Sequence, residues 1–289
     1  MRKICLFVFI FGGFLASNAQ LLWKISGNGL KNPSYIFGTH HLIPISFLDS
    51  VPELYKSFNA CEMIVCELIS NNLDATSKIQ QAAIMPNHIK MKDLFGDKEY
   101  KLVDDELKSV LKFGLTDVAI MNPALILTLY ELEVYKKTTG FSDDIKSDTY
   151  FQLVGVEKGK KIEGLETVDE QIEILFGNNN FQRQADILHQ IVLHKDSSIN
   201  EMLLVNKLYK AGKIQELVKM AQKTGGSLQF SDTEYYKFAD ARNLKWFAKL
   251  PTMMNQQSCF VAVGAMHLGG NNGLLQLFKN AGYKLTAMY

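Results

Sequence analysis

The sequence is poor in the features that mark several common classes of protein. It has only 6 prolines and no Pro- or Ser-rich stretch, so no linker divides it and one compact unit is the simplest arrangement. Its 31 basic and 30 acidic residues are spread without long like-charge runs, which leaves no basic field for nucleic acid. Of the 289 residues, 47% are hydrophobic, which supplies a core and excludes intrinsic disorder. The composition indicates a globular protein that does not bind nucleic acid.

Motifs of several enzyme classes are missing as well. The chain has no G-x-S-x-G segment of a serine hydrolase, no H-E-x-x-H zinc helix and no C-x-x-C pair. Cys66 adjoins Glu67, whose negative charge would raise the pKa of the thiol and weaken it as a nucleophile. Cys66 and Cys259 lie in apolar runs, so we interpret them as buried structural thiols.

The N-terminus has the pattern of a secretory signal peptide. Arg2 and Lys3 precede an apolar run over residues 4–15, and Ser17-Asn18-Ala19 is a small-x-small cleavage site. The run is shorter than the ~20 residues that cross a membrane, so we expect cleavage, with an uncleaved anchor as the alternative. The expected mature protein, residues 20–289, has a formal charge of −1 and no stable membrane span. We expect it in the periplasm or outside the cell.

Six short apolar runs with strand character are separated by amphipathic helical stretches. The expected strands are Leu21–Ile25, Tyr35–Phe37, Met63–Leu68, Lys161–Leu165, Cys259–Val263 and Tyr283–Met288. Residues 72–147 and 167–250 have mainly helical patterns, and capping boxes are expected at Ser50/Glu53, Thr167/Glu170, Ser198/Glu201 and Ser231/Glu234. These patterns predict an α/β fold whose central mixed sheet is formed by N- and C-terminal segments, with large helical insertions. We place residues 20–289 in a single domain with its helical insertion at about 72–250.

One motif occurs twice, each time directly after an expected strand. Gly38-Thr39-His40-His41 and Gly264-Ala265-Met266-His267 both have the form G-x-x-H. The glycine permits a sharp turn or a close backbone approach, and the histidine follows at the carboxyl end of the strand. In open α/β sheets this edge is where ligands bind.

A third polar residue, Glu67, lies at the end of another expected strand. An unpartnered buried carboxylate is costly, so Glu67 requires a cation, a metal or a hydrogen-bonding network. His41, His267 and Glu67 together match a set with which catalytic zinc commonly fills three positions. The alternative is that they are satisfied polar residues that point to unrelated places in a purely structural scaffold. His40 is expected to point away from His41 in an extended segment, toward the rim of the site.

Four segments carry a resemblance to a known family: Leu22-Trp23-Lys24-Ile25, residues 35–41, Val65-Cys66-Glu67-Leu68 and residues 260–270. They resemble the TraB/GumN family, which is related to the Tiki metalloproteases. The similarity runs from about 21 to 289 and includes Asp148, Gly164-Leu165-Glu166-Thr167 with Gln171, Arg242-Asn243 and Ala281-Gly282-Tyr283. One departure is His40, where such proteins usually have an apolar residue. The resemblance implies a metal-dependent, peptidase-like fold with His41, His267 and Glu67 at the active centre and Arg242 as a charged neighbour.

We therefore expect a metal-dependent hydrolase that cleaves peptide or related amide bonds in a peptide or protein substrate. His41 and His267 would bind zinc, manganese or cobalt. Glu67 would complete the ligand set or act as general base on the bound water, and Arg242 could stabilise the oxyanion. A second hypothesis is a non-catalytic envelope protein that holds a peptide or small ligand in the same cleft without a metal.

Overall fold

The computed structural model describes residues 20–69, 73–86, 88–143, 145–176, 180–222 and 231–288. The expected signal peptide lies outside the described residues. The strands are β1 (Leu22–Ser26), β2 (Ser34–Thr39), β3 (Met63–Cys66), β4 (Lys161–Gly164), β5 (Cys259–Gly264) and β6 (Lys284–Ala287). The helices are α1 (Leu54–Ala60), α2 (Leu73–Ala82), α3 (Asp97–Leu111), α4 (Pro123–Thr139), α5 (Ser147–Glu157), α6 (Val168–Leu175), α7 (Phe181–Leu193), α8 (Lys195–Lys210), α9 (Ile214–Ala221), α10 (Asp232–Tyr235), α11 (Ala241–Phe247), α12 (Leu250–Gln256) and α13 (Leu274–Asn280). Short 3-10 turns form η1 (Ile45–Ser50), η2 (Met91–Asp93) and η5 (Ala265–His267), and η4 (Tyr236–Asp240) is a π-helical turn.

The six expected strands all form and join one sheet in the order β4-β3-β5-β2-β1-β6. The four strands from β4 to β2 are parallel, whereas β1 runs antiparallel to both β2 and β6. The predicted α/β class with a mixed central sheet is confirmed. The C-terminal strand β5 lies between β3 and β2, so segments far apart in sequence end at one edge of the sheet.

The central strands are buried along their length because helices cover the sheet. Every residue of β3 is buried, as expected for a parallel strand that reads as a continuous apolar run. Phe58 of α1 and Phe151 of α5 pack on Phe260 of β5, with ring centroids 5.3 and 5.0 Å from that of Phe260. These aromatic contacts attach both helices to the sheet that carries the strand-end motifs.

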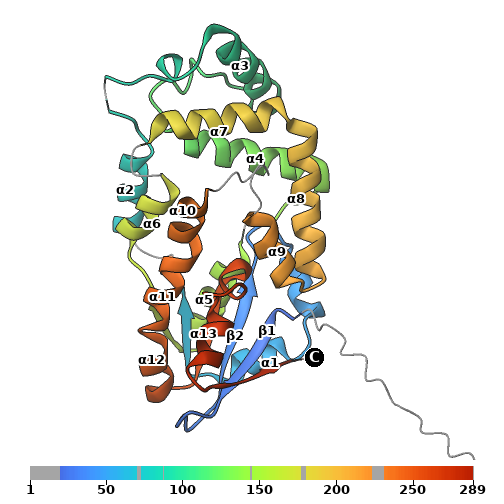
Figure 1. Ribbon diagram of the computed structural model, residues 1–289, viewed down its shortest axis with the longest axis vertical. Helices are drawn as coiled ribbons and strands as arrows, with labels where there is room; N and C mark the ends of the chain where they lie inside the picture. The colour runs from blue at the N-terminus through green and yellow to red at the C-terminus, as the bar shows by residue number, and fades with distance from the viewer. Residues whose placement is uncertain are drawn as a thin grey trace, which may run out of the picture.

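A second apolar cluster is formed by helices that lie between β3 and β5 in the sequence. It joins Val103 and Leu107 of α3, Ile126 of α4 and Leu188 of α7, all of them buried. Figure 1 shows α3, α4 and α7 at the opposite end of the molecule from the lower part of the sheet, with α8 running down one side. The helical segments thus build a layer beyond the carboxyl edge of the sheet.

Two of the four expected capping boxes are confirmed. Thr167 with Glu170 caps α6, and Ser231 with Glu234 caps α10. The other two predictions are wrong. Ser50 ends η1 rather than starting a helix, and Ser198 lies inside α8, where its hydroxyl donates to the His194 carbonyl at 3.3 Å. The same residue spacing occurs within a helix that has already begun, so the pattern alone does not locate a helix start.

The three cysteines of the described chain, Cys61, Cys66 and Cys259, are buried free thiols, which confirms the prediction made for Cys66 and Cys259. Burial raises the pKa of Cys66 to about 12, and the charges of Asp148 and Glu67 add to this effect. Burial also raises the pKa values of Cys61 and Cys259 to about 12. All three thiols are therefore protonated at neutral pH and are poor nucleophiles. In the ranges that the structure covers, no helix is both long and apolar enough to span a membrane.

Candidate active site

The two G-x-x-H motifs lie side by side because β2 and β5 are parallel neighbours. Gly38 is paired with Val263, and Thr39 with Gly264. A Cβ added at Gly38 would lie 2.9 Å from the Ala265 Cα, too close for any other residue to fit without movement. The first glycine therefore permits the close packing of the two motifs.

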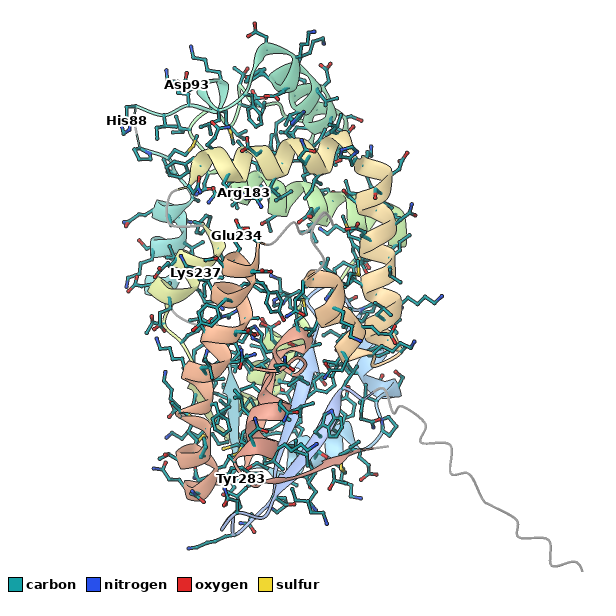
Figure 2. The ribbon with its side chains drawn as sticks, in the orientation of Figure 1. His88, Asp93, Arg183, Glu234, Lys237 and Tyr283 are labelled. Atoms are coloured by element: carbon teal, nitrogen blue, oxygen red, sulfur yellow. The ribbon has the colours of Figure 1, made fainter. Side chains whose placement is uncertain are left out.

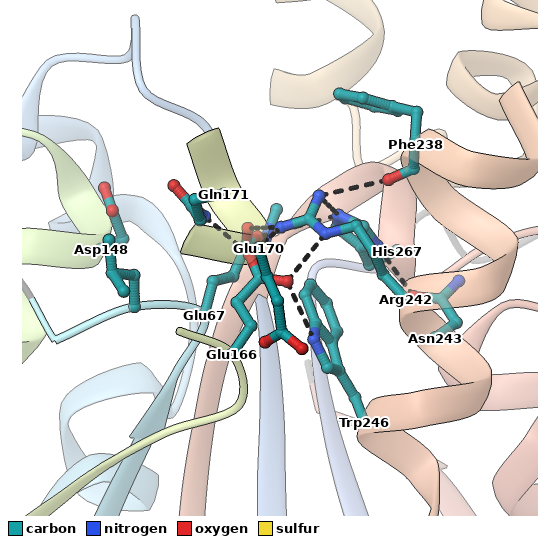
Figure 3. A network of polar contacts seen from close by, with 12 residues as sticks. Glu67, Asp148, Glu166, Glu170, Gln171, Phe238, Arg242, Asn243, Trp246 and His267 are labelled. Carbon is teal, nitrogen blue, oxygen red and sulfur yellow. Dashed lines mark hydrogen bonds and ion pairs between the residues drawn. The ribbon is translucent and has the colours of Figure 1, made fainter. Parts of the chain in front are cut away.

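Glu67 follows β3, the other neighbour of β5, and points toward the second motif. Its Oε1 accepts the Gly264 N–H at 2.7 Å, and its Oε2 accepts from Arg242 Nη2 at 2.7 Å. The Oε1 atom lies 3.9 Å from the Nε2 of His267. Glu67, His267 and Arg242 are thus brought together from three elements, as Figure 3 shows.

Arg242 of α11 is the buried centre of this polar network. It donates from Nε and Nη2 to the two oxygens of Glu166, at 3.0 and 2.5 Å, and from Nη2 to Glu67. Its Nη1 donates to the Phe238 carbonyl at 3.2 Å and to His267 Nε2 at 3.1 Å. A guanidinium has five N–H donors, so every donor has a partner in this arrangement.

Glu166 is a member of this network that the sequence patterns did not single out as a site residue. Its side chain is only 2% exposed and also accepts from Gln171 Nε2 at 2.7 Å and from Trp246 Nε1 at 3.3 Å. The guanidinium lies over the Trp246 ring, with its Cζ 4.6 Å from the centroid. Glu166 comes shortly after β4, as Glu67 follows β3, so a carboxylate just beyond a strand was the signal that could have identified it.

The hydrogen bonds of His267 define its tautomer. Arg242 can only donate, so Nε2 of His267 accepts, and the proton of the neutral ring is on Nδ1. Nδ1 then donates to Asn243 Oδ1 at 2.8 Å, and the Asn243 amide donates to the Asn272 carbonyl at 3.0 Å. Burial lowers the pKa of His267 to about 4, with Glu67 opposing and Arg242 adding to the effect. His267 is therefore neutral at neutral pH.

Glu67 is ionised, whereas its neighbour His267 is neutral. Burial by itself raises the pKa of Glu67, but His267 when it is protonated, the positive charge of Arg242 and the Gly264 N–H outweigh burial and hold the pKa below its usual range. The centre thus combines an ionised carboxylate and a neutral imidazole, both held by one guanidinium.

The two histidines of the first motif point to different partners. His41 is 56% exposed, and its Nδ1 donates to Asp148 Oδ1 of α5 at 3.1 Å. Its charge helps to lower the pKa of Glu67, but it makes no hydrogen bond to that residue. His40 turns toward α8, where its Nε2 lies 2.9 Å from Asn206 Oδ1. Burial lowers the pKa of His40 to about 4, with His41 adding to the effect and the Asn206 hydrogen bond opposing it, so this ring is neutral as well.

The three expected metal ligands do not surround a common point in this arrangement. Nε2 of His267 faces Arg242, and His41 is bonded to Asp148. Across the described parts of the chain, no group of three or more His, Cys, Asp or Glu residues is placed to hold a metal ion. The donor types suit a divalent ion. An ion shared by Glu67 and His267 would, however, have to displace the guanidinium that bridges them.

A cavity of about 840 Å³ lies against this network, and both Glu166 and Arg242 line it. Its other walls come from α4, α6, α7 and the α10–η4 segment, and most of the side chains that line it are apolar or charged. Arg183 of α7 and Glu234 of α10 form a bidentate ion pair between two of these walls, at 3.1 and 3.3 Å (Figure 2). Its size is in the range of small-molecule sites.

The fold and the site define an α/β protein with a buried Glu-Arg-His centre just beyond the carboxyl ends of its parallel strands. A family model described as the TraB/PrgY/gumN family matches residues 21–287, and the chain belongs to this family. No match was found among curated proteins or among solved structures.

Proposed function

We propose that this family member is a hydrolase that cleaves peptide or related amide bonds at the Glu67–Arg242–His267 centre. The observation that carries the proposal is the pairing of an ionised carboxylate with a neutral imidazole 3.9 Å away, beside a cavity that Arg242 lines. Ionisable groups with shifted pKa values that face each other beside a cleft are typical of acid–base centres. The relation to the Tiki metalloproteases, implied by sequence resemblance, supports the same class of reaction.

In the proposed reaction Glu67 accepts the proton of the attacking water and passes it to the leaving amine nitrogen as the C–N bond breaks. Its two hydrogen bonds, from Gly264 and Arg242, keep the carboxylate in one position. Arg242 supplies positive charge for the developing oxyanion. A substrate oxygen would have to replace one of its present acceptors, and the two neutral ones, the Phe238 carbonyl and His267, are both on Nη1. We therefore assign Nη1 of Arg242 as the atom that donates a hydrogen bond to the substrate oxygen.

A divalent ion, either zinc, manganese or cobalt, is a further part of the proposal. His41 and His267 would hold it, Glu67 would either complete the ligand set or remain the general base, and when bound the ion would polarise the scissile carbonyl. The neutral His267 ring and the ionised Glu67 are in the protonation states that metal binding requires. Arg242 would have to withdraw from between them, so metal binding and the present arrangement of Arg242 are alternatives.

The test is a peptide-library digest by the purified mature protein, with and without a chelator, together with elemental analysis. We expect Glu67→Gln to abolish cleavage while the protein remains folded. We expect His41→Ala and His267→Ala to lose both metal and activity, and His194→Ala, a substitution at an exposed helix end, to keep both. Stoichiometric metal in both His41→Ala and His267→Ala would remove the assignment of these histidines as ligands. Cleavage that survives chelation and metal depletion would leave a hydrolase that needs no metal.

The second candidate is a non-catalytic protein that binds a peptide or small ligand in the same cavity. The observation that favours it is that all five N–H groups of Arg242 are already used within the protein. This hypothesis predicts stoichiometric peptide binding without any cleavage product, unchanged by chelator. Mass spectrometry of the peptide after binding distinguishes the two functions.

We also propose that the protein is exported. The support is the N-terminal charged and apolar pattern with its Ser17-Asn18-Ala19 cleavage site. N-terminal sequencing of protein recovered from the periplasm or the medium should give a chain that begins at Gln20. Replacement of Ala19 by a bulky charged residue should block this processing. A mature chain that retains Met1 and sediments with membranes would support the anchored alternative.

A further inference from the structure

One carboxyl group in the cavity has no role in the network described above. Glu131 lies in the middle of α4 and lines the same cavity as Glu166 and Arg242. Within the part of the chain that the structure describes, it makes no hydrogen bond and no ion pair. It is partly buried, and burial raises its pKa to about 7. An isolated carboxyl group in this position is costly unless a ligand supplies its partner.

Other carboxylates of the cavity show what Glu131 lacks. Three of them each have a basic partner: Glu166 with Arg242, Glu234 with Arg183, and Glu170 with Lys245. Glu173 of α6 also has no partner among the described residues, but it is exposed, so water solvates it. Glu131 is therefore the carboxyl group of this cavity that is both withdrawn from water and without a cation.

The surroundings of Glu131 indicate what kind of molecule would supply that cation. Leu127 lies one helical turn before it on α4, and Ile187 and Ile191 of α7 and Ile174 of α6 line the same cavity. These side chains would cover an aliphatic body, whereas Glu131 offers one carboxyl group among them, which an approaching cation would hold in its ionised form. Ligand sites commonly combine an apolar lining with a few polar groups that fix orientation.

We propose that this cavity binds aliphatic peptide segments that carry an ammonium group, and that Glu131 receives the ammonium group. The inference rests on the proposed function, because it names the substrate class of the same site. A lysine side chain and a free α-amino group share this chemistry. Either group would pair with Glu131 in a partly buried cavity, where the effective dielectric constant is lower and the attraction between opposite charges is stronger than at the surface.

The test measures binding of three tetrapeptide amides to the mature protein by calorimetry. The first is acetyl-Leu-Leu-Lys-Leu-amide, the second has norleucine in place of lysine, and the third is the norleucine peptide with a free α-amino group. We expect a Kd about 10-fold lower for at least one ammonium peptide than for the neutral peptide. The peptide that gains affinity identifies the source of the ammonium group. This comparison uses the wild-type chain, so it does not depend on the folding of a variant.

Glu131→Gln keeps the size of the side chain and removes the charge, so it should abolish the preference for the ammonium peptide. Glu133→Gln is the matched control, because Glu133 is on the same helix, pairs with Lys136 and does not line the cavity. Equal Kd values for all three peptides, or an unchanged preference in Glu131→Gln, would overturn the inference. Peptide cleavage, followed by mass spectrometry in the same samples, reports on the proposed function separately. Cleavage without an ammonium preference would leave the hydrolase standing and remove only the role of Glu131.

Discussion

At the scale of single residues, Arg242 neutralises two carboxylates that would otherwise be buried alone. Replacement by methionine should leave Glu67 and Glu166 without a cation, and we expect the free energy of unfolding to fall by about 3–5 kcal/mol. Urea unfolding at pH 7 measures this loss. The control is Arg183→Met, whose ion pair with Glu234 is about one-third exposed and should cost about 1 kcal/mol or less. Equal losses in the two variants would contradict the central position of Arg242.

Gly264 is a second residue whose size matters for the centre. A Cβ at this position would lie 3.3 Å from Glu67 Oε1, so it would press on the carboxylate, and 3.5 Å from the His267 ring, which is an ordinary contact. We expect Gly264→Ala to lower kcat/KM by about 10-fold through the displaced carboxylate, with little change in Tm. Gly164→Ala at the end of β4 is the matched control, because its Cβ would make only ordinary contacts of 3.4 Å or more. Full activity in Gly264→Ala would show that Glu67 tolerates displacement.

At the scale of elements, the Arg183–Glu234 ion pair connects α7 in the helical layer with α10 beside the site. The Arg183 hydrogen bond lowers the pKa of Glu234 to about 2; burial opposes the shift and the Ser231 cap assists it. A lowered carboxyl pKa stabilises the fold above the unfolded value of 4.5, and this stability is lost as pH falls toward 2. The connection between the two helices is therefore acid-sensitive.

The corresponding prediction compares wild type with Glu234→Gln. At pH 6 the free energy of unfolding of the variant should be lower than that of wild type by about 1 kcal/mol at most, because the Arg183–Glu234 pair is partly solvated. The difference should shrink as pH falls from 4.5 toward 2 and should also shrink in 0.5 M salt. Urea midpoints at pH 6 and pH 3 measure it. A difference that is the same at both pH values would mean that the ion pair does not stabilise this connection.

For the whole molecule, two histidines and one glutamate with shifted pKa values change the stability of the fold in acid in opposite directions. His40 and His267, with pKa values of about 4, stay neutral while the unfolded chain takes up protons near 6.5, so acid destabilises the fold. Glu131 has its pKa raised to about 7 in the fold, so it binds its proton at a higher pH than the same residue in the unfolded chain. Protonation of Glu131 therefore stabilises the fold as pH falls. Near pH 5.5 the net effect of these three groups is about one proton in favour of unfolding.

We therefore expect the free energy of unfolding to fall by about 1.4 kcal/mol per pH unit near pH 5.5 as the solution is acidified. Glu131→Gln removes the opposing contribution, so its loss should steepen to about 2.7 kcal/mol per pH unit. Urea unfolding at pH 6.5, 5.5 and 4.5 gives both slopes, and Glu133→Gln should follow wild type. Parallel slopes for wild type and Glu131→Gln would show that Glu131 titrates normally in the fold.

Particular elements show how far the sequence could be interpreted. The strands were predictable because a strand in the middle of a parallel sheet is a short, continuous apolar run, as in β3 and β5. The buried thiols followed from the same runs. The false capping box at Ser198 arose because a four-residue pattern carries no information about where a helix has already started. Glu166 was missed because the strand before it already contains two charged residues, Lys161 and Glu163, so it did not stand out as Glu67 does after the wholly apolar β3.

The α/β class, the six strands and the positions of Glu67 and His267 at strand ends follow from the sequence alone, because apolar runs and their periodicity are properties of local segments. The sequence also indicated that Glu67 needs a partner. Which partner it has depends on the fold. Arg242 is 175 residues away in the chain, on α11, and it contacts Glu67 because the sheet places the end of β3 beside the end of β5, where His267 also contacts Arg242. Strand order and side-chain partners depend on contacts between distant segments, and these form only when the whole sheet assembles.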